Sequence, residues 1–346
     1  MKKILSIALA LLMVCVMLPV VALADEGITT EQALKDAITA ATDGATITLG
    51  GDIDLSQTIT VNKTITLNMN GKKLYNTSDL WDKPTAEAGN WSLISVRGSG
   101  NLTITGNGTF AAKENDCYAV DVQESATVTI KNGTFIGNIH AVYVFAGTAN
   151  VEGGTYSVQQ KYPDPAKGDE FVLNCYDANR ANGTAHINVT GGTFKNFNPA
   201  DNKAEGEGNN FADNSLVVQK NNTVQNNDYY VGNAANEVIA AASKGEEIFV
   251  LNGTTLTNVP AGVIIQNRTG DRITVNGKDV ELTGDAGYTV PASNITIIVP
   301  GDTTPTETPK TEDQKNPSTG ANDVVAAAVA LMAVSALGMA VLTRKK

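Results

Sequence analysis

Residues 93–194 repeat one short phrase four times, as LISVRGSGNLTITGNGTF (93–110), YAVDVQESATVTIKNGTF (118–135), HAVYVFAGTANVEGGTY (140–156) and VLNCYDANRANGTAHINVTGGTF (172–194). Each copy ends in Gly-Thr followed by an aromatic residue. Each copy also carries two short runs in which β-branched and apolar residues alternate with polar ones, the pattern of β-strands. One copy cannot bury its apolar face alone, whereas stacked copies build a continuous core. The repeat therefore predicts a solenoid.

The copies share an aromatic residue and a turn. The aromatic residues are expected to fall in one column of the stack: Phe110, Phe135, Tyr156 and Phe194. The pairs that precede them by one residue are rich in Gly and Asn: Asn107-Gly108, Asn132-Gly133, Gly153-Gly154 and Gly191-Gly192. Because Gly and Asn tolerate a positive φ, each copy should turn a tight corner at the same place. The runs are rich in Thr and Val and poor in helix formers, which disfavours a helical repeat. The prediction is an all-β, right-handed parallel β-helix.

Composition limits the partners of the chain. Charged residues make up 18% of the 346 residues, and the net charge is -11. An acidic surface repels nucleic acid and anionic membranes, so nucleic acid is not an expected partner. Cys117 and Cys175 occupy different places in the repeat, so the sequence leaves open whether they pair.

The N-terminus has the features of a secretory signal. Lys2 and Lys3 precede an apolar run, and Ala22-Leu23-Ala24 follows, with small residues at the two positions that a signal peptidase reads. We expect residues 1–24 to be a signal peptide, with cleavage after Ala24 and a mature chain that begins at Asp25.

The C-terminus combines a motif, an apolar span and a basic tail. Asn316, Pro317, Ser318, Thr319 and Gly320 form the motif. An uncharged stretch at 324–342 follows, and Arg344-Lys345-Lys346 ends the chain. At about 1.5 Å per residue, the uncharged stretch is long enough to nearly cross a hydrocarbon core of roughly 30 Å. Residues 301–315, rich in Thr and Pro, are expected to form an extended linker.

This order resembles the cell-wall sorting signal of Gram-positive surface proteins, whose usual pentapeptide is Leu-Pro-x-Thr-Gly. In that family a sortase cleaves between Thr and Gly and joins the Thr carbonyl to a peptidoglycan amine. The resemblance implies that Thr319 becomes linked to the wall of a Gram-positive bacterium and that residues 320–346 are discarded. Asn316 replaces the usual Leu, which leaves open which sortase acts. The alternative is a retained transmembrane helix. The precursor would touch a membrane only through this span.

The chain between its ends divides into two parts. Residues 25–231 are expected to form the β-helix, and residues 232–300 a smaller helix-plus-β module that either continues the solenoid or stands apart. Thr29 and Gln32 have capping-box spacing, which predicts a short helix that plugs the first coil. Alternating residues from Ile47 to Leu74 predict the opening coil, and residues 216–231 a degenerate one.

The connections that follow the Gly-Thr-aromatic corners are 75–92, 111–117, 136–139, 157–171 and 195–214, and they include every long loop except one, at about 177–183. Stacked coils should set these loops side by side, and loops on a rigid scaffold are where function is usually found. Their aromatic residues are the candidate ligand-binding residues: Trp81, Trp91, Tyr162, Phe197 and Phe211. Flat aromatic rings can stack on sugars. Acidic residues in the last loop raise the alternative of Ca²⁺, but they lack a recognised spacing, so no metal site or cofactor is predicted.

The predicted fold resembles that of pectate lyases, but the residues do not support their chemistry. The residues at one equivalent position of the four copies are Ser95, Asp121, Tyr143 and then Asn174 or Cys175. They include one carboxylate and no pair of carboxylates. His140 is interpreted as a turn residue and His186 as a sheet-surface residue. No catalytic residue is predicted. We expect an adhesin or glycan-binding module that recognises host, dietary or bacterial glycans. A polysaccharide lyase or hydrolase and a passive structural stalk are the alternatives.

Overall fold

A computed structural model of the chain describes residues 27–80, 91–114, 117–160, 171–200, 215–220, 227–281 and 287–292. These residues all belong to one compact unit. The predicted signal peptide and its cleavage site, the linker and the sorting signal lie outside the described residues, as do Trp81, Tyr162 and Phe211. Within the described part, no helix is long and apolar enough to cross a membrane.

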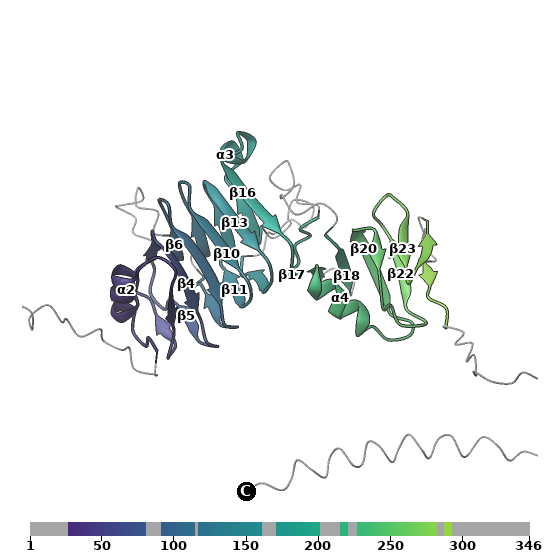
Figure 1. Ribbon diagram of the computed structural model, residues 1–346, viewed down its shortest axis with the longest axis horizontal. Coiled ribbons are helices and arrows are strands. Elements are labelled where there is room, and N and C mark those ends of the chain that lie inside the picture. The colour runs from purple at the N-terminus through teal and green to yellow at the C-terminus, as the bar shows by residue number, and fades with distance from the viewer. Residues whose placement is uncertain are drawn as a thin grey trace, which may run out of the picture. The chain divides into compact units, whose positions relative to one another are not determined.

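The described chain is mostly β, with long parallel sheets and few helices, consistent with an all-β parallel solenoid. From β1 to β17, successive strands lie in three different sheets, and each strand pairs in parallel with the strand three places before or after it. Figure 1 shows the strands of successive coils stacked side by side. The prediction of an all-β protein built from stacked parallel strands is confirmed.

The first sheet contains β1 (Ala45–Thr48), β4 (Thr64–Asn68), β7 (Asn101–Thr105), β10 (Thr127–Ile130), β13 (Gly147–Val151) and β16 (Ala185–Val189). The second begins with β2 (Ile53–Asp54), β5 (Lys73–Tyr75), β8 (Thr109–Ala111), β11 (Thr134–Gly137), β14 (Thr155–Val158) and β17 (Gly192–Lys195). The third contains β3 (Ile59–Val61), β6 (Ser92–Val96), β9 (Tyr118–Val122), β12 (Val142–Val144) and β15 (Leu173–Cys175).

The core is a set of columns that run along the stack. The predicted aromatic column is present in the second sheet, where Leu74 pairs with Phe110 and the four aromatic residues follow in register. Successive ring centroids are 4.8, 5.1 and 5.1 Å apart with nearly parallel planes, and all four rings are buried. Offset stacking of this kind adds to the free energy gained from burying the rings.

The corners between the first and second sheets follow the expected pattern with one correction. Positive φ angles occur at Asn107, Gly133, Gly154 and Gly192. Asn132 does not have a positive φ; its Oδ1 instead accepts a hydrogen bond of 3.1 Å from the backbone N–H of Asn107 in the coil before.

The first helix, α2 (Glu31–Ala40), plugs the start of the stack with Leu34 and Ile38, which are both buried. Its N-cap is Thr30, whose side chain accepts a hydrogen bond from the backbone N–H of Ala33, so the predicted cap at Thr29 is wrong by one residue. The residues from Ile47 to Leu74 belong to β1–β5, which is more than one coil. The alternation of residues continues through each corner and therefore does not reveal where a coil ends.

The parallel stack ends at β17. The expected degenerate coil at 216–231 is instead an antiparallel pair, β18 (Val217–Lys220) and β19 (Asp228–Val231), and β19 also runs antiparallel to β17. Helix α4 (Asn233–Ala240) follows, and the second sheet then continues with β18, β20 (Glu247–Asn252), β22 (Ile264–Asn267) and β25 (Tyr288–Thr289). The other elements are α3 (Asp177–Ala181), β21 (Thr255–Leu256), β23 (Ile273–Val275) and β24 (Lys278–Val280).

Residues after the parallel stack share its sheet but form their own core. A second buried cluster includes Ile239 of α4, Ile248 of β20 and Ile265 of β22, and it is separate from the core of the coils. The module is therefore joined to the solenoid through the second sheet while burying its apolar residues by itself.

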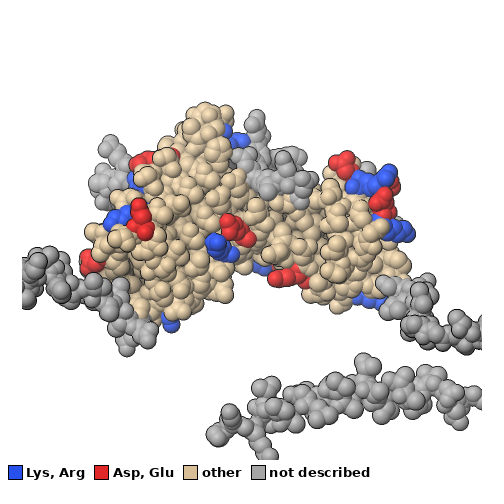
Figure 2. All heavy atoms as spheres, in the orientation of Figure 1, with Lys and Arg blue, Asp and Glu red and all other residues tan. Residues whose placement is uncertain are grey.

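The outer side of the first sheet is uncharged over most of its width. One column in register contains only Thr and Asn: Thr46, Thr66, Thr103, Thr129, Asn150 and Asn188. Figure 2 shows few charged side chains over the coils in this view. Charged and aromatic groups that could select a ligand are thus better sought on the third sheet.

Candidate functional site

Two columns of side chains mark the outer side of the third sheet, and together they are called here the third-sheet face. The first column is in register across the strands: Thr60, Ser95, Asp121, Tyr143 and Asn174. Their neighbours along each strand, such as Val120 and Val122, belong to the core, so alternation directs the column away from it. The predicted column is confirmed, and Asn174, not Cys175, is its last member.

The second column lies two residues further along each chain segment and consists of Arg97, Gln123, Phe145 and Tyr176. Backbone hydrogen bonds of 2.9 Å keep it in register, from Gln123 N–H to the Val96 carbonyl, and likewise from Phe145 to Val122 and from Tyr176 to Val144. The fold thus brings one cation, one amide and two aromatic rings from four successive coils into one row.

The polar half of the face is a connected network around a buried carboxyl. Asp121 is 1% exposed and accepts hydrogen bonds from Ser95 Oγ at 3.0 Å and from Gln123 Nε2 at 2.7 Å. Ser95 Oγ in turn accepts from Arg97 Nε at 2.9 Å. Burial raises the pKa of Asp121 to about 6, against the opposing effect of these hydrogen bonds and of the Arg97 charge. Asp121 therefore changes its charge in mildly acidic solution.

The aromatic half contains a stacked pair that is open to solvent. Phe145 and Tyr176 are 39% and 43% exposed, and their ring centroids are 4.8 Å apart at an interplanar angle of 24°. Large apolar side chains normally lie in the core, so two stacked rings at the surface make this part of the face a candidate contact surface.

Further aromatic rings surround Tyr143 behind this pair. The ring of Tyr143 lies 5.0 Å from Tyr118 and 5.4 Å from His140, and Trp91 stacks on Tyr118 at 6.3 Å. Tyr118 also lies 5.1 Å from His140, so the rings form one connected cluster. It fixes the orientation of Tyr143, whose ring is only partly buried.

His140 belongs to this cluster and lies in the connection between β11 and β12, as its interpretation as a turn residue requires. Its side chain is buried, with Nδ1 2.6 Å from the Phe171 carbonyl and Nε2 3.2 Å from Asn174 Nδ2. Since the carbonyl can only accept, Nδ1 carries the proton and Nε2 accepts from Asn174. Burial lowers the pKa of His140 to about 4, so the ring is neutral at neutral pH. His186 lies half-buried in β16 of the first sheet, as its interpretation as a sheet residue requires.

Of the predicted ligand-binding residues that are described, one lies at the face and one does not. Trp91 is half-buried at the edge of the aromatic cluster. Phe197 is fully buried and its ring centroid is 6.1 Å from Phe194, so it is a core side chain and not an exposed ring. Sequence reasoning missed Phe145 and Tyr176. The signal was available, because both directly follow a third-sheet strand at the same point of the repeat.

The described residues provide no obvious metal site. Among them, no group of three or more His, Cys, Asp and Glu side chains is placed to hold an ion. Cys117 and Cys175 are both buried and free, which answers the open question of their pairing.

No family model, no curated protein and no solved structure matches this sequence. The residues themselves are therefore the basis for assigning a function.

Proposed function

We propose that this chain is a glycan-binding module of a bacterial surface and that the third-sheet face is its binding site. The observation that carries the proposal is the row formed by Arg97, Gln123, Phe145 and Tyr176. Aromatic rings stack on the apolar faces of sugars, while guanidinium and amide groups bind sugar hydroxyls. Adjacent coils are about 4.8 Å apart, so the row spans roughly 14 Å, enough for several sugar units.

The finer description of the fold is part of this proposal. Parallel strands in one sheet are joined by right-handed connections in nearly all known cases, which supports a right-handed β-helix of the pectate-lyase type. Such a scaffold is rigid, and it holds one site residue from each coil at a fixed spacing. A rigid row of this kind suits an extended polymer better than a small, compact ligand.

Anchoring to the wall rests on the two chain ends alone. A secretory leader, the Asn316–Gly320 motif, an apolar span and a basic tail together support export and attachment by a sortase. Thr319 would form the bond to peptidoglycan, with the module held outside the cell by the linker. The glycans within its reach would then be those of a host, of the diet or of other bacteria.

A glycan array tests the binding proposal. The protein should retain one class of glycan, and Tyr176→Ala and Phe145→Ala should each reduce that signal at least tenfold. Tyr288→Ala is the matched control, because it removes a half-exposed tyrosine from β25, far along the sequence from the face. Equal binding by all four proteins, or no binding to any glycan, would contradict the proposal.

An enzyme that cleaves polysaccharides is the second candidate, and Asp121 is the observation in its favour. A carboxyl whose pKa is about 6 can give and take a proton near neutral pH. However, Asp121 is the one carboxyl in the two columns of the face. Glycoside hydrolases normally use two carboxyls about 5 to 9.5 Å apart. Release of reducing or ultraviolet-absorbing ends by the wild type, and its loss in Asp121→Asn, would favour the enzyme over the binder.

A further inference from the structure

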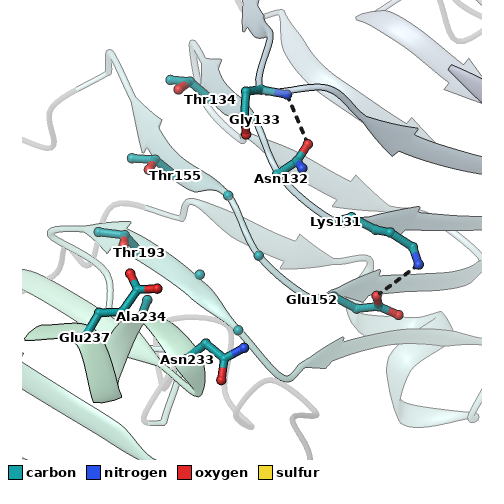
Figure 3. A pocket seen from close by; sticks show the side chains of 15 residues that line it. Lys131, Asn132, Gly133, Thr134, Glu152, Thr155, Thr193, Asn233, Ala234 and Glu237 are labelled. Atoms are coloured by element: carbon teal, nitrogen blue, oxygen red, sulfur yellow. Dashed lines mark hydrogen bonds and ion pairs between the residues drawn. The ribbon is translucent and has the colours of Figure 1, made fainter. Parts of the chain in front are cut away.

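A groove of about 700 Å³ lies at the corner where the first sheet turns into the second, and Figure 3 shows it from close by. Its lining comes from the turns of four successive coils, from the start of the second-sheet strands and from α4. None of these lining residues belongs to the third sheet, so the groove is separate from the third-sheet face.

One wall of the groove is bare backbone, and the stacking of the coils keeps it so. A Cβ on Gly153 would overlap the carbonyl oxygen of Lys131 in the coil before, and a Cβ on Gly191 would overlap that of Glu152. Gly154 and Gly192 have φ angles of 99° and 120°, which larger residues rarely adopt. No side chain can therefore fill this wall, and it stays free of side chains along the groove.

The floor presents one hydroxyl from each coil. Thr134 pairs with Thr155, and Thr155 with Thr193, so the three side chains form a row that Figure 3 shows. The hydroxyls are therefore spaced by about 4.8 Å, which is close to the length of one pyranose unit. Asn233 and Glu237 of α4 also line the groove, and Figure 3 shows Glu237 beside Thr193, at the end of the row.

The charges and side chains of the groove narrow the class of ligand. Lys131 and Glu152 lie 3.9 Å apart and offset each other, which leaves Glu237 as the remaining charge. An anion would be repelled by that carboxylate. No aromatic side chain is among the lining residues, so an aromatic or apolar ligand would find no partner. Hydroxyl, amide and carboxylate groups together suit a neutral, hydroxyl-rich molecule.

We propose that this groove binds a neutral oligosaccharide, with one sugar unit on each threonine of the row. Thr155 and Thr193 bind sugar hydroxyls from the floor, and the Glu237 carboxylate accepts from two adjacent hydroxyls at the end of the row. The site is independent of the third-sheet face and gives the chain a second point of attachment to a glycan. Two weak sites on one rigid scaffold hold a polymer more tightly than either does alone.

Isothermal titration of the full chain with neutral hexasaccharides from β-glucan, xylan and mannan tests this proposal. For at least one of them, Thr155→Val and Glu237→Gln should each weaken binding tenfold or more. Thr109→Val is the matched control: Thr109 pairs with Thr134 in the same threonine row but does not line the groove, and its replacement should leave the affinity unchanged. Valine keeps the shape of threonine, and circular dichroism checks that each variant folds.

The outcomes separate the groove from the third-sheet face. Tyr176→Ala should leave the groove site intact, so the Tyr176→Ala protein should still lose affinity when Thr155→Val is added. If no neutral hexasaccharide binds, or if Thr155→Val and Thr109→Val behave alike, the groove proposal is wrong. A result in which Tyr176→Ala removes all binding and the groove variants have no effect also overturns it, while leaving the third-sheet face as the binding site.

Discussion

Replacing Asp121 with asparagine should change how the stability of this protein depends on pH, because two buried groups of the third-sheet face titrate in opposite directions. Burial raises the pKa of Asp121 from 3.8 to about 6 and lowers that of His140 from 6.5 to about 4. Between pH 4 and 6, the folded chain holds a proton on Asp121 and none on His140. The unfolded chain holds a proton on His140 and none on Asp121. The pair binds the same number of protons in both states, so its net contribution to the pH dependence is close to zero.

Asp121→Asn removes the titration of Asp121 and leaves that of His140. The pKa of His140 is lower in the folded state, so the stability that it contributes is full above pH 6.5 and is lost as the pH falls towards 4. As the pH is raised from 4 to 6, the free energy of unfolding of the variant should therefore increase by about 1.4 kcal/mol per pH unit, or about 3 kcal/mol in all. For His140→Gln, the free energy of unfolding should instead fall as the pH rises from 4 to 6. The pKa of Asp121 is higher in the folded state, so its contribution is full below pH 4 and is lost as the pH rises to 6.

Urea denaturation followed by circular dichroism at pH 4, 5, 6 and 7 measures these slopes. Relative to the wild type, the free energy of unfolding should increase with pH for Asp121→Asn and decrease with pH for His140→Gln. Asp36→Asn, at a surface position of α2, controls for the loss of one negative charge. Parallel profiles for the wild type and both variants would show that folding does not keep Asp121 protonated and His140 neutral between pH 4 and 6.

Three further predictions concern packing and anchoring. Phe135→Ala should cost about 3 to 5 kcal/mol in urea denaturation, because it empties the middle of the buried aromatic column, whereas the exposed Phe145→Ala should cost much less. Gly153→Ala should cost about 1 to 3 kcal/mol by overlap with a backbone carbonyl, and Gly51→Ala, whose nearest neighbours lie at ordinary contact distance, should be milder in the same assay. Thr319→Ala should prevent release of the protein by peptidoglycan digestion, and mass spectrometry of the wild type should find Thr319 as its last residue, joined to a wall fragment.

The sequence was sufficient for the fold because the repeat specifies register. A Gly-Thr-aromatic end in every copy aligns Phe110, Phe135, Tyr156 and Phe194, and this alignment sets the register of the second sheet. Strand direction after β17 could not be obtained in this way. The alternation in 216–231 is the same for a parallel and an antiparallel strand, so only tertiary contacts decide between them.

The candidate site was harder to predict because its parts are far apart in the sequence and lie beside the loops, not on them. Trp91 was predicted because it lies in a long connection. The row that contains Arg97, Gln123, Phe145 and Tyr176 forms only when the coils are stacked. The environment of His140 depends on the Phe171 carbonyl and on Asn174, which come from a later coil. No local pattern indicates that a histidine will be buried by residues more than thirty positions away.

The energetics of Asp121 bear on the choice between the proposed functions. At neutral pH the buried carboxyl is ionised, and its raised pKa lowers the stability of the fold by about 3 kcal/mol relative to a carboxyl whose pKa is unchanged by folding. A neutral asparagine would not carry that cost, and it could accept from Gln123 through its oxygen and donate to Ser95 through its amide nitrogen. A stalk needs only stability, and for a stalk asparagine would be the better residue. The ionised carboxyl attracts the Arg97 guanidinium, an interaction that a stalk does not need, so it favours the proposed binding face over a passive support.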